Sequence, residues 1–447
     1  MNLKPLKYSF LCILLTSLLL PINIKADTTE EIEPPEIAAE SAIVMDASNK
    51  AVLYEKNAYE KQYPASITKL MTALLTIENL EPDDTITFSY DAIFGIDRES
   101  NHIALDVGEE ITVDQALHAL LLMSANEVAC GLAEKISGST EEFGRLMTKR
   151  AEELGSQHTN FTNPHGLHDP NHFTTAYDMA LIGSYLTTND YFLSIMQDFK
   201  YEIPPTNKKK VPTLLAQQHA MLSPYKDARI HRDDVIGGKT GFTDEAGHTL
   251  GTMATPGDTT LVVVILKGTK DFYNDTAKLL DYGFNAYKSI EIHSANDIIK
   301  TMPIYGVISG QVYQSGNCGL SVPESVSVTI PIDTSIDDIS INYDIPNDFS
   351  SNLKLGDTVG EVTYVYKAKT VGKSPIVVSQ INPVQSPKMH FYGRLSGSWF
   401  KYILICLALL ILIFILYVIA THSINTRSRH RKNKFKNIDK LAKRSHH

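Results

Sequence analysis

An uncharged run of nineteen residues, Tyr402–Ala420, lies near the C-terminus and cannot belong to an ordinary water-exposed surface. An apolar helix of that length is long enough to cross a bilayer. Nine Lys or Arg residues and one acid, Asp439, follow the run, and basic residues typically flank the cytoplasmic side of a span. We therefore expect a transmembrane helix at residues 401–421, a basic cytoplasmic tail at 422–447, and the body of the chain outside the membrane.

The N-terminus carries a second apolar run, Tyr8–Leu20, which follows Lys4 and Lys7 and precedes the small residue Ala26. This pattern is typical of a secretory signal peptide, because the run is short for a membrane span. We assign residues 1–26 to a signal peptide. A retained N-terminal anchor is the alternative, so cleavage of the segment stays open.

The net charge of −10 conceals an acidic body between two basic ends. Without the signal peptide and the tail, 29 basic residues stand against 50 acidic ones, a net charge of about −21. An acidic body is unsuited to a nucleic-acid backbone, so we expect no nucleic-acid partner. Of the cysteines, Cys130 and Cys318 lie in this body, and the sequence does not decide whether they form a disulfide.

The apolar patterns predict an α+β domain at residues 41–289. Alternating stretches flank Asp46–Lys50 as in a hairpin, and helical patterns occupy much of residues 66–186. Alternating stretches return at 247–267 and precede a helical pattern at 271–287. Strands, then helices, then strands predict an antiparallel sheet with packed helices and a helical subdomain.

A different pattern follows residue 290. Short runs rich in Val, Ile and Thr alternate with Gly, Pro, Asp and Asn, which predicts a small all-β domain at residues 290–380. Residues 381–400 contain prolines and indicate a linker to the membrane. The acidic residues 27–40, which contain two adjacent prolines, indicate a flexible leader.

Ser66-Ile67-Thr68-Lys69 opens the first helical pattern, shortly after Pro64. A serine in a first helical turn lies near free backbone N–H groups that favour developing negative charge. Lys69, three residues further on, shares its helix face. Burial and a neighbouring cation, for which Lys239 is the candidate, would lower the pKa of Lys69 and make it a base. The alternative is a capping serine with an exposed lysine.

Ser124-Ala125-Asn126 falls at a joint between two helical patterns. A joint can turn both polar side chains into a cleft. There Ser124 would relay a proton between Lys69 and a leaving amine, and Asn126 would hold a substrate amide. The alternative is a plain helix cap, a position that favours both Ser and Asn.

A third motif, Lys239-Thr240-Gly241-Phe242, lies in a glycine-rich stretch before the later strand patterns. Its glycines would let a substrate backbone lie along an edge strand. Lys239 and Thr240 can bind a free carboxylate, and the backbone N–H groups of Ser66 and Phe242 are candidate oxyanion donors. The alternative is a glycine-rich turn with a solvated lysine.

In this order and spacing, the three motifs resemble those of the penicillin-binding D-alanyl-D-alanine carboxypeptidases of low molecular mass. The stretches 161–167 and 172–178 resemble the same family, and the likeness extends over about residues 40–290. The all-β domain resembles the family's second domain less distinctively. The stretch Gln217–Leu222 departs from the Asn-x-Asn-x-Leu-Leu that the family often has there, which puts contacts from that loop in question.

The resemblance implies a β-lactamase/transpeptidase-like fold and a cell-surface serine carboxypeptidase that needs no cofactor and no metal. It implies Ser66 as the acylated nucleophile, Lys69 as the base, Ser124 and Asn126 as second-motif residues, and Lys239 as the carboxylate binder. The substrate would be the peptidoglycan stem pentapeptide, from which the terminal D-alanine is removed. β-Lactams would acylate the same serine.

Four alternatives remain at this point. A transpeptidase would share every motif, and a β-lactamase would need a deacylating glutamate pattern that is not evident. An inactive wall-binding module would be expected to lack motif residues, and all are present. A zinc enzyme could use the residues clustered in one stretch, although they lack the glutamate of H-E-x-x-H; they are His158, His165, His168, Asp169 and His172.

Overall fold

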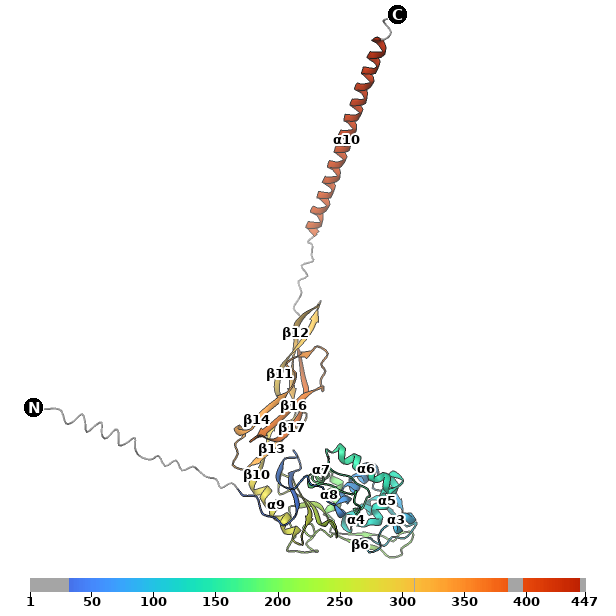
Figure 1. Cartoon of the computed structure of the whole chain (residues 1–447), viewed down its shortest axis with the longest axis vertical. Helices are drawn as coiled ribbons and strands as arrows, with labels where there is room; N and C mark the ends of the chain where they lie inside the picture. The colour runs from blue at the N-terminus through green and yellow to red at the C-terminus, as the bar shows by residue number, and fades with distance from the viewer. Residues whose placement is uncertain (1–31, 309, 385–396, 443–447) are drawn as a thin grey trace, which may run out of the picture. The chain divides into compact units, whose positions relative to one another are not determined.

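The structure of the chain is a computed structural model that describes residues 32–308, 310–384 and 397–442. The predicted signal peptide lies outside these residues. The chain divides into two compact units, of which the first ends at Pro383 and the second begins at Val384 (Figure 1). The first unit contains an α+β domain followed by an all-β domain, and the second contains a long helix.

A five-stranded antiparallel sheet in the order β2-β1-β9-β8-β7 forms the centre of the α+β domain. Its strands are β1 (Ser41–Asp46), β2 (Val52–Lys56), β7 (Val235–Thr243), β8 (Gly247–Ala254) and β9 (Leu261–Gly268). β1 is buried along its whole length and β9 along nearly all of it, as expected when helices cover both faces of a sheet. The edge strands are β2 and β7, so the sheet is open at two opposite edges.

Helices and two small two-stranded sheets, β3-β4 and β5-β6, make up the rest of the domain. They are η1 (Ala65–Thr68), α2 (Lys69–Asn79), β3 (Thr85–Thr87), α3 (Tyr90–Phe94), β4 (Glu110–Thr112), α4 (Val113–Leu122), α5 (Asn126–Ser137), α6 (Thr140–Glu153), α7 (Ala176–Leu186), α8 (Asp190–Gln197), β5 (Lys200–Ile203), β6 (Thr213–Ala216) and α9 (Phe272–Ala286). Side chains start several helices: Thr112 and Gln115 form a capping box on α4, and Ser139 and Thr175 cap α6 and α7.

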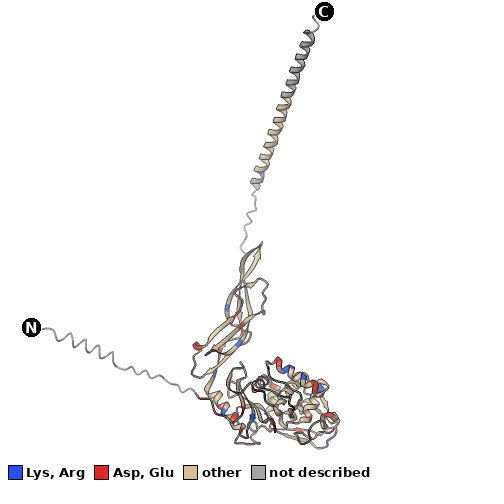
Figure 2. Ribbon diagram, viewed as in Figure 1, with Lys and Arg blue, Asp and Glu red and all other residues tan. Residues whose placement is uncertain are grey.

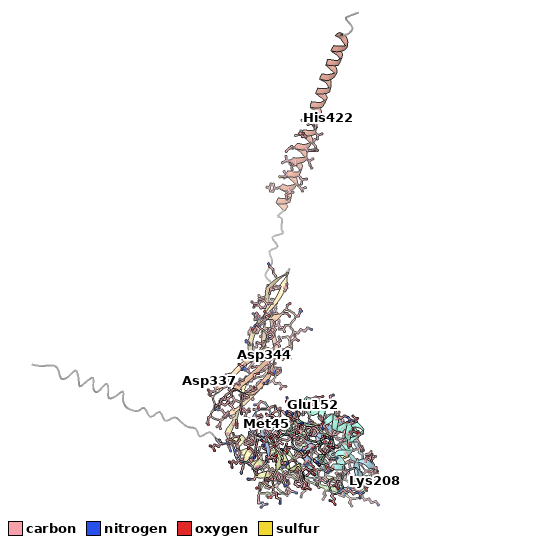
Figure 3. The ribbon with its side chains drawn as sticks, in the orientation of Figure 1. Met45, Glu152, Lys208, Asp337, Asp344 and His422 are labelled. Carbon is pink, nitrogen blue, oxygen red and sulfur yellow. The ribbon has the colours of Figure 1, made fainter. Side chains whose placement is uncertain are left out.

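Helices α7 and α9 cover opposite faces of the sheet. Gly183 of α7 lies against Val262, whereas Gly283 of α9 lies against the neighbouring residue Leu261. Adjacent residues of a strand point to opposite faces, so the two helices lie on opposite sides of β9. The core beneath α7 includes Met45 of β1, labelled in Figure 3, which is fully buried.

The outer surface of the domain carries charges of both signs, as α6 illustrates (Figure 2). Arg145 pairs with Glu141 and Glu142 on the same helix, and Arg150 pairs with Glu78 of α2 at 2.7 Å. Exposed pairs of this kind contribute little to stability, so packing rather than surface charge holds α6 in place.

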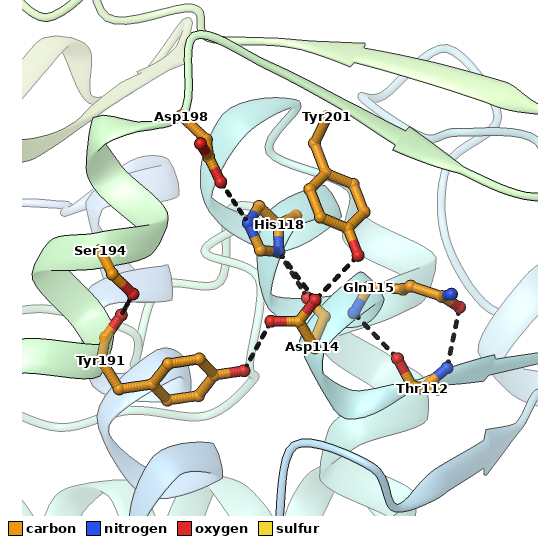
Figure 4. A network of polar contacts seen from close by, with 8 residues as sticks. All are labelled: Thr112, Asp114, Gln115, His118, Tyr191, Ser194, Asp198 and Tyr201. Atoms are coloured by element: carbon orange, nitrogen blue, oxygen red, sulfur yellow. Dashed lines mark hydrogen bonds and ion pairs between the residues drawn. The ribbon is translucent and has the colours of Figure 1, made fainter.

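A network of polar side chains ties α4 to α8 and to the β5–β6 hairpin (Figure 4). Asp114 accepts hydrogen bonds from the hydroxyls of Tyr191 and Tyr201, each at 2.8 Å. His118, one turn along α4, lies 2.7 Å from the Asp114 carbonyl oxygen and 3.1 Å from Asp198, and it stacks on Tyr201. Because α4 leads directly into the second motif, the network fixes the helix that presents this motif.

The all-β domain begins where α9 ends. Its elements are β10 (Tyr287–His293), β11 (Ile298–Ile308), β12 (Gln311–Ser321), β13 (Val326–Pro331), η2 (Ile336–Asp338), β14 (Ser340–Asp344), β15 (Phe349–Ser350), β16 (Thr358–Tyr366) and β17 (Lys369–Pro383). β10 pairs with β13, and the other strands form a sheet in the order β14-β16-β17-β12-β11-β15. Alternate residues of β13, β16 and β17 point inward and build an apolar core separate from that of the first domain.

Hydrogen bonds join the two domains of the first unit. Thr329 of β13 donates to the Asp46 carboxylate at 2.5 Å, and Asn49 donates to Thr329 at 2.8 Å. Tyr287 donates to the Leu53 carbonyl oxygen at 2.9 Å. The partners in the α+β domain belong to the β1–β2 hairpin, so this hairpin is a point of attachment for the β domain.

The second unit is formed by α10 (Gly397–Ala442). Its segment Lys401–Ser423 is long and apolar enough to cross a membrane, and no other helix among the described residues meets this criterion. The predicted fold class is therefore confirmed: an α+β domain with a helical subdomain, a small all-β domain and an apolar C-terminal helix.

Two segments differ from the sequence-based expectation. The end of the predicted flexible leader is packed, because the backbone N–H groups of Ala38 and Ala39 donate to the buried Asp275 carboxylate at 3.0 and 2.9 Å. A buried carboxylate needs such donors. Strand β17 continues to Pro383, so residues 381–383, assigned to the linker, belong to the sheet through pairing with β12.

The cysteines of the body do not form a disulfide. Cys130 and Cys318 are each buried in a different domain, and both are free thiols. Each packs as a small apolar side chain, a usual role for a buried cysteine.

Candidate active site

The first motif lies on the short 3-10 helix η1 and the start of α2. Thr249 of β8 holds η1 in place by donating to the Pro64 carbonyl oxygen at 2.8 Å. Lys69 Nζ lies 3.1 Å from Ser66 Oγ. The predicted first α-helical turn is a 3-10 turn, in which residues three apart are eclipsed. This tighter turn aligns the two side chains more closely than an α-helix would.

The Lys69 side chain is completely buried. Its Nζ lies 2.6 Å from Asn126 Oδ1 and 2.6 Å from the His165 carbonyl oxygen. Burial, followed by repulsion from Lys239, holds the pKa of Lys69 well below its ordinary value, whereas the nearby Glu127 opposes this shift. The environment therefore shifts Lys69 toward its neutral, proton-accepting form.

The second motif lies between α4 and α5. Ser124 has a left-handed backbone with φ of 61°, which is uncommon for a residue with a side chain. Its hydroxyl is buried, and it has no hydrogen-bond partner among the described residues. Asn126 begins α5, and its backbone N–H donates to the Asn101 carbonyl oxygen at 2.8 Å. Since Asn126 Oδ1 contacts Lys69, the amide nitrogen of Asn126 is the group left for a ligand.

The third motif lies within the edge strand β7, not in a turn before a strand. The Lys239 side chain is almost fully buried, and burial lowers its pKa to about 7. A Cβ atom at Gly241 would lie 2.6 Å from the Ser66 backbone nitrogen and 2.4 Å from Thr249 Oγ1. Only glycine lets β7 approach η1 this closely, and the approach brings the third motif to the first.

The segment 161–174 wraps around the start of α2. His172 Nε2 lies 2.9 Å from Thr68 Oγ1, and Thr72 donates to the Pro164 carbonyl oxygen at 2.6 Å. A Cβ atom at Gly166 would lie 1.9 Å from the Ala65 carbonyl oxygen, so this position requires glycine. The segment thus contributes backbone to the site, including the carbonyl oxygen that contacts Lys69.

The histidines of this segment do not converge on one point. Burial lowers the pKa of both His165 and His172 to about 3, which keeps their rings neutral. Among the residues that the structure describes, no group of three or more His, Cys, Asp or Glu side chains is placed to hold a metal ion. The histidine cluster seen in the sequence therefore corresponds to loop contacts.

The motifs line one cleft with a volume of about 510 Å³. Six of the predicted site residues line it: Ser66, Ser124, Asn126, Thr240, Gly241 and Phe242. Lys69 and Lys239 lie buried behind this lining. The structure therefore brings all eight predicted site residues together from elements that are far apart in the sequence.

The cleft also includes residues that the sequence did not reveal. They are Glu99, Ser100, Asn101, Leu167, Gln218, Ala220, Lys226, His248, Phe272 and Tyr273. Asn101 belongs to a loop held by Glu127, whose carboxylate accepts the Ile103 N–H at 2.6 Å. No motif marks this loop, and its closeness to the second motif depends on the fold.

The stretch that departs from the family pattern also reaches the cleft. Gln218 and Ala220 line it, and the Ala220 N–H donates to the Tyr273 hydroxyl oxygen at 2.8 Å. His219 is buried beside Gly238 and lies 3.1 Å from Thr252 Oγ1. The altered loop therefore lies on the wall of the cleft, and Gln218 also contacts Met123, the residue before the second motif.

Comparison with known proteins gives the same family over nearly the whole body. A family model described as D-alanyl-D-alanine carboxypeptidase matches residues 28–270, and one described as penicillin-binding protein 5, C-terminal domain, matches residues 287–381. The D-alanyl-D-alanine carboxypeptidase DacC of Escherichia coli is 29% identical over 398 residues, covering 83% of this chain and 93% of its own length. DacF of Bacillus subtilis is 27% identical over 372 residues, covering 81% and 90%.

Solved structures extend the similarity to the fold. Penicillin-binding protein 5 from Haemophilus influenzae superposes with a TM-score of 0.65 at 26% identity, covering 78% of this chain and 99% of that one. The D-alanyl-D-alanine carboxypeptidase of Mycobacterium tuberculosis gives 0.52 at 27% identity, covering 57% and 94%. A mutant of the Streptomyces K15 DD-transpeptidase gives 0.52 at 27% identity, covering 56% and 99%.

Proposed function

This chain belongs to the serine D-alanyl-D-alanine carboxypeptidases, the low-molecular-mass penicillin-binding proteins. We propose that Ser66 is the nucleophile with which it removes the terminal D-alanine from peptidoglycan stem pentapeptides. The observation that carries the proposal is the environment of Lys69. A serine hydroxyl is a weak nucleophile until a base removes its proton. The base must be neutral at the working pH and within reach of the hydroxyl.

We propose that Lys69 is this base, because its pKa is lowered and its Nζ lies 3.1 Å from Ser66 Oγ. A neutral amine has two N–H groups and one lone pair. Asn126 Oδ1 and the His165 carbonyl oxygen, each 2.6 Å from Nζ, can accept the two N–H groups. The lone pair is then left for the hydroxyl hydrogen of Ser66, whose Oγ is 3.1 Å away. This arrangement supports Lys69 as the general base.

The proposed reaction has two steps. Ser66 Oγ attacks the carbonyl carbon of the penultimate D-alanine while Lys69 takes the hydroxyl proton. The oxyanion is stabilised by the backbone N–H groups of Ser66 and Phe242. The peptide bond breaks as the leaving nitrogen receives a proton through Ser124. Water then attacks the acyl ester, which releases the shortened stem peptide and restores the Ser66 hydroxyl.

Lys239 and Thr240 are proposed to bind the terminal carboxylate of the substrate. Burial lowers the pKa of Lys239 to about 7, and a bound carboxylate would favour its charged form. The side-chain nitrogen of Asn126 would hold the substrate amide, and Gly241 would let the substrate backbone run along the open edge of β7. β-Lactams present a reactive carbonyl beside a carboxylate, so we expect them to acylate Ser66 too.

We further propose that the segment Lys401–Ser423 anchors the protein as a single membrane span. The catalytic domain (41–289) and the β domain (290–380) would lie on the extracytoplasmic side. The basic tail (422–447) would lie in the cytoplasm, in agreement with the positive-inside rule. Protease added to sealed, right-side-out vesicles should digest the body of the protein and spare an epitope fused to the tail. Loss of that epitope would show that the tail faces outward and would refute the proposed orientation.

Intact-mass analysis with benzylpenicillin tests the nucleophile. We expect a covalent adduct on the parental chain and on Ser100→Ala, a matched serine variant in the same cleft, but no adduct on Ser66→Ala. An adduct that persists on Ser66→Ala would refute the assignment. Failure of the parental chain to form an adduct or release D-alanine would indicate the inactive binding module.

The similarity to the Streptomyces DD-transpeptidase makes transpeptidation a second function to test. A pentapeptide substrate and an added amine acceptor separate the two. Free D-alanine with a shortened, unmodified peptide indicates the carboxypeptidase, whereas acyl transfer to the amine as the main product indicates the transpeptidase. Rapid release of hydrolysed penicillin, with recovery of the free enzyme, would indicate a β-lactamase.

A further inference from the structure

A second cavity, of about 880 Å³, lies between the two domains of the first unit. One wall is the β1–β2 hairpin of the catalytic domain, and the other is the β16–β17 hairpin of the β domain. We call it the interdomain groove. It borders the β2 edge of the five-stranded sheet, whereas the active-site cleft borders the β7 edge. Four strand spacings, about 19 Å in all, separate these edges, so the groove is a separate site.

The β16–β17 hairpin presents a row of lysines to the groove. Lys367, Lys369 and Lys373 line it, and all three are exposed. The two residues of the turn, Lys367 and Ala368, have φ of 45° and 65°, a conformation usually occupied by Asn or Gly in such hairpins. The turn thus uses a lysine where glycine would be conformationally easier.

Four lysines and one acidic residue belong to the groove lining. Glu55 of β2 lines the groove, and Glu361 pairs with Lys373 at 3.1 Å. Lys50 also lines the groove, but its ammonium group donates to the Ala47 carbonyl oxygen and is therefore turned toward its own hairpin. The lining remains cationic on a body whose net charge is about −21, so the groove is a local site of opposite sign.

Tyrosines form much of the remaining lining. Tyr59 is 51% exposed and lies 4.9 Å from Tyr177, ring centre to ring centre. Tyr54 and Tyr287 also line the groove, as does Tyr366, over whose ring Lys367 Nζ lies 5.2 Å from the centre. A tyrosine offers an apolar ring face and a polar hydroxyl. This pairing suits a sugar ring, which has apolar C–H faces and a rim of hydroxyl groups.

We propose that the interdomain groove binds an acidic glycan strand, with sugar rings against the tyrosines and carboxylates against the lysines of the β16–β17 hairpin. A phosphate polymer would use the lysines but would leave the tyrosine faces without a matching surface. Only the identification of the glycan as a wall strand rests on the proposed function. A glycan strand bound here would contact both domains. Its binding would therefore restrict motion between them at the Thr329–Asp46 hydrogen bond.

Calorimetric titration of the full chain in detergent, carrying Ser66→Ala, tests the proposal without any catalysis. The main probe is stem-free wall glycan from amidase digestion, which carries lactyl carboxylates. Neutral chitohexaose and poly(glycerol phosphate) are the comparison probes. The groove variant is Lys367→Glu with Lys369→Glu. Its matched control is Lys354→Glu, an exposed lysine of the same domain outside the groove lining.

We expect the groove variant to bind the stem-free glycan at least about tenfold more weakly, and Lys354→Glu to bind within about twofold of the parent. Tyr59→Ala should also weaken binding, whereas Tyr90→Ala, another exposed tyrosine, should not. Added salt should weaken binding of the acidic glycan. Equal melting temperatures would establish that the variants are folded.

Three results would overturn the proposal. These are undiminished glycan binding by the groove variant, equally tight binding of chitohexaose, and binding of poly(glycerol phosphate) without the glycan, which would indicate a phosphate-polymer site. A parallel assay keeps this inference separate from the enzyme function. With Ser66 restored, the groove variant should release D-alanine from a soluble pentapeptide at the parental rate.

Discussion

Replacing Gly241 by alanine tests whether the close approach of β7 to η1 builds the active site. The added Cβ would lie 2.6 Å from the Ser66 backbone nitrogen, and ordinary contacts begin at 3.4 Å. The two segments must therefore separate by about 0.8 Å, because backbone cannot rotate away as a side-chain tip can. A misplacement of about 1 Å can cost on the order of 10²-fold in rate. We expect acylation to slow by about 10- to 100-fold.

The matched control is Gly251→Ala in the neighbouring strand β8. There the new Cβ meets only the tip of Leu70, at 3.3 Å, which can move aside. Overpacking costs about 1–3 kcal/mol, so Gly241→Ala should also melt a few degrees lower. Stopped-flow acylation by a fluorescent penicillin measures the rate, and calorimetry measures stability. Acylation of Gly241→Ala at the rate of Gly251→Ala would refute this account of the site.

Three further predictions follow from the contacts of the site and the domain joint. Lys69→Arg should lower D-alanine release by about 10²–10⁴-fold, because a guanidinium stays protonated, and it should lower the melting temperature too, because the site is fully buried; release within tenfold of the parent would argue against the base. In a pH series, kcat/KM should fall as the pH rises through about 7, where Lys239 in the free enzyme loses its charge, and Lys239→Arg should move this limb upward; an unmoved limb would assign it to another group. Thr329→Val removes the hydrogen bond to Asp46 and should lower the free energy of unfolding by about 1–3 kcal/mol, with D-alanine release from a soluble peptide unchanged; equal stability on calorimetry would show that the joint does not depend on this bond.

The sequence predicts those parts of the molecule that depend on local pattern. The helix Val113–Leu122 lies within the predicted helical stretch 66–186, and the hairpin around Asp46–Lys50 forms as two paired strands. Each has a strong apolar period and polar residues at its ends, so local preference and packing agree. The three motifs are likewise visible because their side chains are chemically distinctive. The sequence therefore predicts the candidate site residues and the fold class without coordinates.

What the sequence does not reveal depends on contacts between distant segments. Asn101 reaches the cleft because Glu127 holds its loop, and the His165 carbonyl oxygen contacts Lys69 because segment 161–174 wraps around α2. A backbone oxygen carries no residue-specific signal. The interdomain groove is missed for the same reason, since its two hairpins lie about 320 residues apart in the chain and neither is a motif.

Two backbone conformations at the site could not be predicted from the local sequence, because they are unfavourable for the residues that adopt them. Ala65, next to Ser66, and Ser124 have positive φ of 48° and 61°, although neither is glycine. Such a conformation costs about 1–2 kcal/mol and persists only where neighbours determine it. Gly166 packs against the Ala65 carbonyl, and α4 and α5 enclose Ser124 on both sides. The surrounding packing thus holds the serines of the first two motifs in positions that their own sequences disfavour, which explains why the folded body, and not the motifs alone, makes the site.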